Sequence, residues 1–474
     1  MDRWTEPTLA VVGHPNKGKS SIVSTLAEDR TVLIGAEAGT TVRARVYPMR
    51  VDGRVIYNLV DTPGFQRART VLAWLQERAT SADERRPAVE AFVEAHRGNA
   101  RFVDECELLE PILRGAGILY VVDGSVPYGP EYEAEMEILR WTGQPSMALI
   151  NLIGSDYHGE AWKNALNQYF RVVREFNAVH SEFSQRLALL RVFGELEPAW
   201  HEPLNEAISV LGEARAYLDR QAYRAIAEMM AEMLVADETK KISVEDSAEG
   251  YEDKLLETLK SKLRRIESTA RRNIERIYRF GDLERQESSL PALQEDLFSE
   301  DQWYLWGLNR KELLGVGAVG GAVVGGALDV GIGGASLMLG SLVGAVVGGA
   351  AALAGSHQLA QSKVMNLPMG GKVLQCGPVR DRNFPYVVLA RAIVHRNLVG
   401  ARSHADRGRL EVSKEQSFEW SDVTTAADRA RLERTIGKLR DGSTNPEFID
   451  TLSELIAGVC DRVAEQGRAE QNSL

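Results

Sequence analysis

The residues best suited to chemistry lie near the start of the chain. They fit the pattern G-x-x-x-x-G-K-S and follow the apolar run Leu9 to Val12. In the order strand, glycine loop, helix, the loop N–H groups and the positive helix end converge on phosphate oxygens. The alternative is a glycine turn before an ordinary helix. The candidate nucleotide-binding residues here are Gly13, His14, Pro15, Asn16, Lys17, Gly18, Lys19, Ser20 and Ser21.

Individual side chains in and after this loop have distinct predicted roles. Lys19 is expected to reach the β- and γ-phosphates of a nucleotide, and the Ser20 hydroxyl to ligate a magnesium ion that bridges them. A second apolar run, 55–60, ends in D-T-P-G, with Asp61 first and Gly64 last. Asp61 is therefore expected at the end of a strand that faces the phosphates. We predict that it holds magnesium through water and that Gly64 contacts the nucleotide.

Thr40 and Thr41 lie between these motifs, followed by a β-hairpin predicted over 42–60 with its turn at Asp52-Gly53. The forms G-x-P-N-x-G-K-S-S, G-T-T and D-T-P-G resemble small GTPases of the translation-factor-related class, and in particular the Era, EngA, TrmE and FeoB branch. The resemblance covers roughly the first third of the chain. It implies a P-loop G domain of α/β fold, whose mostly parallel sheet has one antiparallel hairpin strand, and it implies binding of GTP and Mg²⁺.

The resemblance also implies how GTP is hydrolysed. It assigns catalytic roles to Lys19, Thr41 and Asn16. In this branch an asparagine at the Asn16 position helps to hold a potassium ion that neutralises charge in the transition state; the alternative is that Asn16 only braces the loop. Ras-like enzymes orient water with a glutamine at the place of Phe65, whose ring cannot do so. We therefore expect slow turnover that potassium (K⁺) stimulates. The magnesium residues are Ser20, Thr41 and Asp61.

The base-reading motif N-K-x-D of this branch is incomplete. Asn151 stands at its start, but L-I-G follows, so the lysine and the aspartate are missing. Guanine selection needs a carboxylate that accepts from the ring N–H and the amine, and the nearby candidate is Asp156, two positions late. Alternatively, Asp156 is the N-cap of a helix over 161–175. We still expect GTP as the nucleotide.

Further elements are needed to position these residues. Strands are predicted over 117–123, 146–151 and 187–193, with a helix over 131–141, which is the pattern of a parallel sheet. The intervening stretch 68–114 is rich in Glu, Arg and Ala, and it predicts one or two inserted helices in place of the ordinary second switch. The insertion is either a plain surface element or a partner-sensing element.

Composition restricts the class of protein. The chain has 474 residues, 44% of them hydrophobic and 26% charged, and a formal net charge of −11. This length predicts about two to four domains, and the negative charge argues against nucleic acid as a partner. Cys106, Cys376 and Cys460 show no metal-site spacing and fit a reducing cytoplasm. The first residues do not form a signal peptide, so we expect the nucleotide domain to stay in the cytoplasm.

The second half predicts an all-helical region that resembles the C-terminal domain of unknown function in certain bacterial GTPases. A helix over 251–279 is amphipathic with a basic face, which indicates either packing or attraction to anionic lipid. Helices are also predicted over 203–236, 384–404 (with Arg391, Arg396 and Arg402 along it), 427–440 and 446–465, and a short strand over 372–376. The predicted domains are a G domain (1–200), a helical linker domain (201–310), a glycine-rich hairpin (311–356) and a mostly helical C-terminal domain (357–474).

The stretch 313–355 carries no charge except Asp329, and about a third of it is glycine. Apolar parts of roughly 16 and 26 residues flank Asp329, compared with about 20 needed to cross a bilayer as a helix. Glycines spaced four apart would let two such helices pack closely. We predict a glycine-zipper transmembrane hairpin that contacts membrane lipid; the alternative is a hairpin packed inside the protein. The expected interfacial anchor is Trp303, Tyr304, Trp306, Arg310 and Lys311.

Together these features predict a GTP-binding and GTP-hydrolysing switch at the cytoplasmic face of the inner membrane. We expect an unidentified protein partner and nucleotide-dependent homo-oligomers. Two alternatives stay open. One is an interaction scaffold in which the nucleotide only stabilises the fold, and the other is a dynamin-like membrane remodeller.

Overall fold

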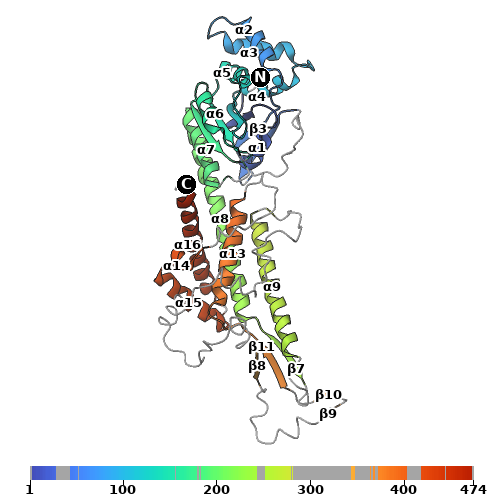
Figure 1. Ribbon diagram of the computed structural model, residues 1–474, viewed down its shortest axis with the longest axis vertical. Coiled ribbons are helices and arrows are strands. Elements are labelled where there is room, and N and C mark those ends of the chain that lie inside the picture. The colour runs from blue at the N-terminus through green and yellow to red at the C-terminus, as the bar shows by residue number, and fades with distance from the viewer. Residues whose placement is uncertain are drawn as a thin grey trace. The chain divides into compact units, whose positions relative to one another are not determined.

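The chain forms two compact units, Met1–Ala216 with Ala401–Gly408, and Tyr217–Gly400 with Arg409–Leu474. Figure 1 shows their elements coloured in chain order. Each unit is described by itself below. The computed structural model describes residues 3–27, 43–51, 53–154, 156–178, 181, 183–242, 251–278, 280, 343–346, 363–364, 367–368, 372–402, 418–443 and 445–471.

A six-stranded sheet forms the centre of the first unit, with strand order β2-β3-β1-β4-β5-β6. Neighbouring strands are parallel except β2 and β3, which form the predicted antiparallel hairpin. The central strands are uninterrupted apolar runs because both faces of the sheet are covered. The predicted α/β fold of the G domain is confirmed. The strands are β1 Thr8–Val12, β2 Arg45–Val51, β3 Arg54–Asp61, β4 Gly117–Asp123, β5 Ser146–Asn151 and β6 Val172–Phe176.

Helices cover both faces of this sheet, because successive strand residues point to opposite sides. Tyr120 of β4 belongs to an apolar cluster with side chains of α2 to α6, whereas the adjacent Val121 belongs to one with α1, α7 and the start of α8. The helices are α1 Lys19–Ala27, α2 Ala68–Gln76, α3 Arg85–His96, α4 Val103–Leu113, α5 Glu133–Trp141, α6 Gly159–Leu166, α7 Phe183–Leu196 and α8 His201–Val235, with 3-10 turns at Pro130–Tyr132 and Pro198–Trp200.

Three predictions for this unit need correction. Residues 187–193, predicted as the last strand, lie within α7. The last strand is instead β6, which overlaps the end of the predicted helix 161–175. A short apolar run has the same pattern in a buried strand and in a buried helix, so periodicity cannot separate them. Strand pairing decides which segment is the last strand, because β6 lies parallel to β5, with Phe176 opposite Asn151. The insertion 68–114 contains three helices, α2, α3 and α4, rather than one or two.

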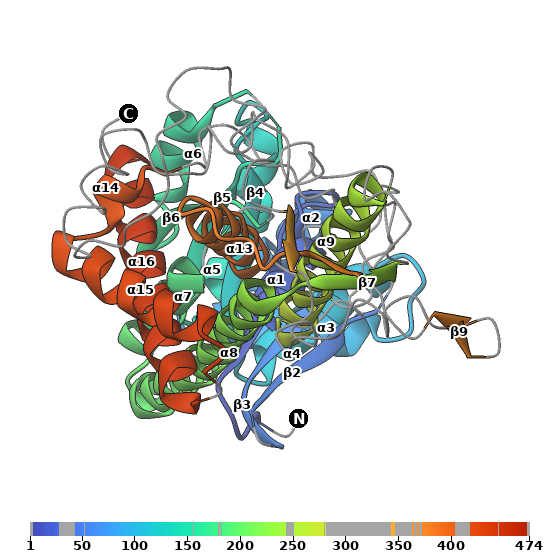
Figure 2. The same ribbon diagram turned by 90° about the horizontal axis from the view of Figure 1, so that it is seen from below.

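The second unit is largely helical, and its core is one apolar cluster built from α8, α9, α13, α15 and α16. Figure 2 shows α13 between α16 and α9, and nearly all residues of α13 are buried. The region is not all helical, because β7, β11 and β8 form a three-stranded antiparallel sheet and β9 and β10 a small hairpin. The elements are β7 Glu238–Ile242, α9 Glu252–Ile277, β8 Val343–Val346, β9 Lys363–Val364, β10 Leu367–Pro368, β11 Lys372–Cys376, α13 Phe384–Ala401, α14 Trp420–Val423, α15 Ala426–Arg440 and α16 Pro446–Gln471.

The predicted glycine-rich hairpin, 311–356, lies outside the described residues except for one piece. That piece, Val343–Val346, is β8, a strand paired with β11, so the prediction of helix is wrong for these four residues. β-branched valine favours a strand, and glycine is costly in a helix. Within the part of the chain that the structure describes, no helix combines the length and apolar character needed to span a membrane.

Charged side chains lie inside the helical unit. Arg391 of α13 is 1% exposed, and its Nε donates to the Glu267 carboxylate of α9 at 2.9 Å, with which Arg271 also pairs. Burial opposes ionisation of Glu267, but the two arginines outweigh it, so the pKa of Glu267 lies below its usual value. Removing one partner of such a buried pair typically costs about 3–5 kcal/mol. The arginines on the predicted helix 384–404 thus include one that ties two helices together.

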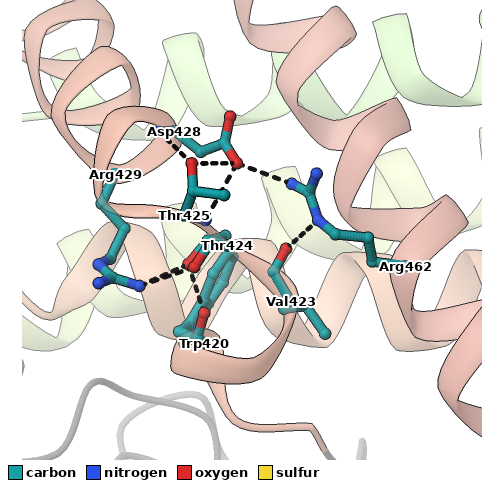
Figure 3. A network of polar contacts seen from close by, with 7 residues as sticks. All are labelled: Trp420, Val423, Thr424, Thr425, Asp428, Arg429 and Arg462. Atoms are coloured by element: carbon teal, nitrogen blue, oxygen red, sulfur yellow. Dashed lines mark hydrogen bonds and ion pairs between the residues drawn. The ribbon is translucent and has the colours of Figure 1, made fainter.

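A polar network joins the start of α15 to α16 (Figure 3). Thr425 and Asp428 form a capping box, in which Thr425 Oγ1 accepts from the Asp428 N–H and Asp428 Oδ2 accepts from the Thr425 N–H. Arg462 of α16 donates to the same Asp428 oxygen at 3.1 Å and to the carbonyl of Val423. The cap therefore fixes both where α15 begins and how it packs on α16.

Candidate functional site

The phosphate loop lies against the ends of β4 and β5. Gly13 and Gly18 have positive φ angles of 140° and 81°. A Cβ at Gly13 would come within 3.0 Å of the Val121 carbonyl of β4, and one at Gly18 would meet the Asn151 side-chain amide of β5. Both glycines are required for the path of the backbone as well as for the space around it. The loop N–H groups are thus held at the edge of the sheet where the parallel strands end.

Asn16 has the third unusual backbone in the loop, with φ of 61°. Asparagine adopts this left-handed conformation more readily than most residues. Its side chain is exposed. The position therefore has a conformational reason to be asparagine, whether or not the amide also binds a cation.

Lys19, the first residue of α1, is buried beside the loop, and its Nζ donates to the His14 carbonyl at 2.9 Å. Burial lowers the pKa of this ammonium to about 8, although the negative charges of Asp61 and Glu135 act to raise it. A buried ammonium next to converging backbone N–H groups is suited to bind the oxygens of a polyphosphate. Ser21 follows in the first turn of α1.

Ser20 and Asp61 bring two hard oxygen donors together. The Ser20 hydroxyl donates to Asp61 Oδ2 at 2.8 Å, and Asp61 is 2% exposed at the end of β3. A hydroxyl and a carboxylate of this kind, next to a phosphate site, are ligands that suit Mg²⁺. The residues present therefore fit the predicted ion. Thr41, the third predicted magnesium residue, and Thr40 lie outside the described residues.

The segment after Asp61 packs onto the phosphate loop. Thr62 Oγ1 donates to the Val11 carbonyl of β1 at 2.8 Å. Gly64 approaches Pro15 so closely that a Cβ on Gly64 would lie 2.5 Å from the Pro15 nitrogen. Phe65, at the place where Ras-like enzymes have glutamine, is 1% exposed and belongs to the core. Its ring therefore packs inward.

Asn151 connects three parts of the site. Its Nδ2 donates to the Lys17 carbonyl of the phosphate loop at 3.3 Å, and its Oδ1 accepts from the Ala178 N–H at 3.2 Å. Ala178 lies in the loop after β6, which is the true last strand. Asp156 is exposed, and the N-cap position of α6 is His158, so the alternative role of Asp156 as N-cap is wrong. Reading of the base by Asp156 stays a prediction.

Two acidic residues near the loop were not predicted. Glu135 of α5 is 2% exposed; its Oε1 lies 2.8 Å from His14 Nδ1, and its Oε2 accepts from the Tyr120 hydroxyl at 2.9 Å. Burial and Glu135 raise the pKa of Tyr120 well above its usual value. Asp123 at the end of β4 lies 3.8 Å from Lys17 Nζ. The only sequence signal for Asp123 was its place after an apolar run, the same signal that identified Asp61.

Comparison with protein families divides the chain. Residues 8–152 match the family described as "50S ribosome-binding GTPase". Residues 163–453 match the family described as "Domain of unknown function (DUF3482)". The first match covers the phosphate loop, Asp61 and Asn151, so the site lies within a P-loop GTPase domain. The second covers more than half of the chain.

Among individual proteins, the chain is similar to GTPase Der of Agathobacter rectalis (35% identical over 101 residues, 20% of this chain and 23% of that protein). It is also similar to GTPase Der of Mycoplasma pneumoniae (31% over 146 residues, 31% of this chain and 27% of that protein). The chain thus spans about a quarter of the length of these relatives. A crystal structure of Aquifex aeolicus Era bound to GDP and aluminium fluoride gives a TM-score of 0.28 at 16% identity, covering 57% of this chain and 88% of that one.

The lowered pKa of Lys19 predicts a pH-dependent affinity for triphosphates. The charged ammonium binds phosphate, and in the free protein Lys19 loses this charge above about pH 8. Binding must then take up a proton, so affinity falls by up to about tenfold per pH unit above that value. Calorimetry between about pH 7 and pH 9 with a non-hydrolysable triphosphate measures this slope.

Two substitutions at Lys19 serve as controls for that measurement. Lys19→Arg stays charged over the whole range and should lose the slope, whatever its affinity. Lys19→Ala should bind weakly at every pH. A flat profile in the unaltered protein would contradict the lowered pKa of Lys19, because an ammonium that stays charged from about pH 7 to about pH 9 produces no slope.

Proposed function

This chain belongs to the family described as domain of unknown function DUF3482, and we propose that it is a molecular switch that binds and hydrolyses GTP through its N-terminal G domain. The observation that carries the proposal is the convergence of Lys19, the Ser20–Asp61 pair and the phosphate-loop backbone at one edge of the sheet. This region matches a GTPase family, and its relatives named above are GTPases. Hydrolysis by this chain is inferred from that support.

The residues of the site have distinct parts in this function. The loop backbone and Lys19 bind the β- and γ-phosphates, and Ser20 and Asp61 hold Mg²⁺, which when bound neutralises charge on the same phosphates. Asn151 fixes the phosphate loop relative to the loop after β6. Phe65 cannot orient the attacking water, and the resemblance assigns the catalytic roles to Lys19, Thr41 and Asn16 instead.

Competition binding with GTP and ATP tests the nucleotide. We expect GTP to bind more tightly in the parent protein, and Asp156→Ala to reduce that preference, because the base would lose its carboxylate partner. Equal affinity for both nucleotides in the parent protein would contradict the assignment to GTP. Binding without release of phosphate, under conditions in which the protein is stably folded, would favour the scaffold alternative.

We propose further that potassium stimulates turnover through Asn16. The proposal rests on the resemblance of the loop to potassium-using GTPases and on the exposed position of Asn16 in the phosphate loop. The left-handed backbone decides the choice of variant. Asn16→Gly removes the amide but accepts φ of 61°, whereas Asn16→Ala would also strain the loop.

In the parent protein, GTP turnover should rise severalfold when sodium is replaced by potassium, with magnesium and ionic strength held constant. Asn16→Gly should keep its affinity for GTP and lose that rise. Equal rates in the two salts would remove potassium from the mechanism. A rise that persists in Asn16→Gly would leave Asn16 with a purely conformational role.

The third part of the proposal is that the switch acts at the cytoplasmic face of a membrane, through the part of 313–355 that lies outside β8, the strand paired with β11. Its support is the sequence alone: a nearly uncharged stretch preceded by aromatic and basic residues. We also propose, from the sequence alone, a protein partner, nucleotide-dependent self-assembly and membrane remodelling. That nucleic acid is not a partner also stays a prediction.

Cysteine labelling tests the membrane proposal, and the three native cysteines are buried. In inverted membrane vesicles, an impermeant maleimide should label Arg380→Cys, which lies at an exposed position, and should fail to label Asp329→Cys at the far side of the hairpin. Equal labelling of the two positions would argue against a crossing. Recovery of the protein in the soluble fraction under every nucleotide condition would argue against membrane action altogether.

A further inference from the structure

We propose that Glu105 and Glu107 of α4 form a clamp that couples two backbone segments, one that follows Asp61 and one that precedes β2. The first segment is 64–67, which follows Asp61, and the second is the chain around Ala44, which follows Thr41. In this view the inserted helices do more than cover the sheet, because α4 holds both segments at once. The inference rests on the proposed GTPase function and concerns how that function is controlled.

Glu105 holds the first segment. Its Oε1 accepts from the backbone N–H of Gln66 at 3.0 Å and of Arg67 at 2.6 Å, and the residue is completely buried. Arg67 is the N-cap of α2, and within the described residues its side chain makes no capping hydrogen bond. The carboxylate of Glu105 therefore supplies, from another helix, the cap and the negative charge that favour a helix N-terminus.

Glu107 holds the second segment. Its Oε2 accepts from the Ala44 backbone N–H at 3.0 Å. Ala44 stands immediately before β2 and three positions after Thr41, the predicted magnesium and catalytic residue. Residues two apart on a helix point to different sides. The two carboxylates can therefore reach two separate segments from one turn of α4.

The support for both contacts is rigid. The α4 residues Leu108, Leu109 and Ile112 are completely buried in the core beneath the sheet. On the other side, segment 61–67 is fixed to β1 by the hydrogen bond from Thr62 to the Val11 carbonyl, and it lies against the phosphate loop where Gly64 meets Pro15. A displacement at the phosphates thus passes along this short segment to α4, and from α4 to Ala44. Glu105 and Glu107 act as positioning residues, since neither contacts the phosphate site itself.

The contacts within the described residues make a sharp experiment possible. In Glu107→Ala, the Ala44 amide should exchange hydrogen about tenfold faster. The coupling predicts a second effect: the Gln66 and Arg67 amides, which Glu107 does not touch, should also exchange faster. Glu107→Gln keeps an acceptor oxygen and should restore both rates. Glu110→Ala, which removes an exposed carboxylate of the same helix that pairs with Arg97, is the matched control and should change neither.

Turnover gives the second readout. Because the clamp positions groups without binding GTP, Glu107→Ala should lower kcat by about fivefold or more while KM changes little. If only Ala44 exchanges faster and kcat is unchanged, the two contacts are independent anchors and the proposal is wrong. Hydrogen exchange can be measured whether or not the protein hydrolyses GTP. A protein that shows coupled exchange but no GTP hydrolysis would therefore overturn the proposed function while retaining the clamp.

Discussion

The nucleotide site depends on the close approach of the phosphate loop to the ends of two strands. At Gly13 the backbone passes the Val121 carbonyl, and at Gly18 it passes the Asn151 amide, with no room for a Cβ at either place. Because the loop is held at both glycines, α1 starts at Lys19 with its ammonium buried beside the loop. Ser20 then meets Asp61. The chemistry of the site is a consequence of this packing, since the same residues on a free loop would have no common target.

Acidic side chains on helices affect the site in two ways: one acts through its charge, and the others through hydrogen bonds to the backbone. Glu135 is a buried negative charge that contacts His14 and raises the proton affinity of Lys19. Glu105 and Glu107 contact backbone instead, and they hold the chain at 66–67 and at Ala44. The phosphate loop has the usual form of a phosphate-binding fold. The contacts of these carboxylates are therefore the features of the site that are particular to this chain. Two of them, Glu105 and Glu107, give α4 of the insertion 68–114 a role beyond covering the sheet.

The helical unit follows a different principle. Its core is apolar, but it encloses charged pairs that join helices distant in sequence, such as Arg391 with Glu267 and Arg396 with Asp219. Buried pairs contribute little net stability, yet they strongly disfavour arrangements in which the partners are separated. They therefore select one packing of the helices. The capping box at Thr425 and the Arg462 contact select the junction of α15 and α16 in the same way.

The sequence by itself determined the local features of this protein. It predicted the phosphate loop, the position of Asp61 at a strand end, the β2–β3 hairpin and the long helices, because these follow from glycine spacing and from apolar periodicity. It failed at 172–176 and 187–193, where short apolar runs suit either element, and only the pairing of β6 with β5 decided between them.

Tertiary structure alone decided which distant residues meet. The contacts of Glu105 with 66–67, of Glu107 with Ala44 and of Glu135 with His14 all join residues far apart in the sequence. Likewise, the sequence predicted that Arg391 lies on a helix, but its burial depends on Glu267, which is 124 positions away along the chain. The physical reason is that a charge can leave water only when a partner meets it, and a period within one segment carries no information about a partner in another.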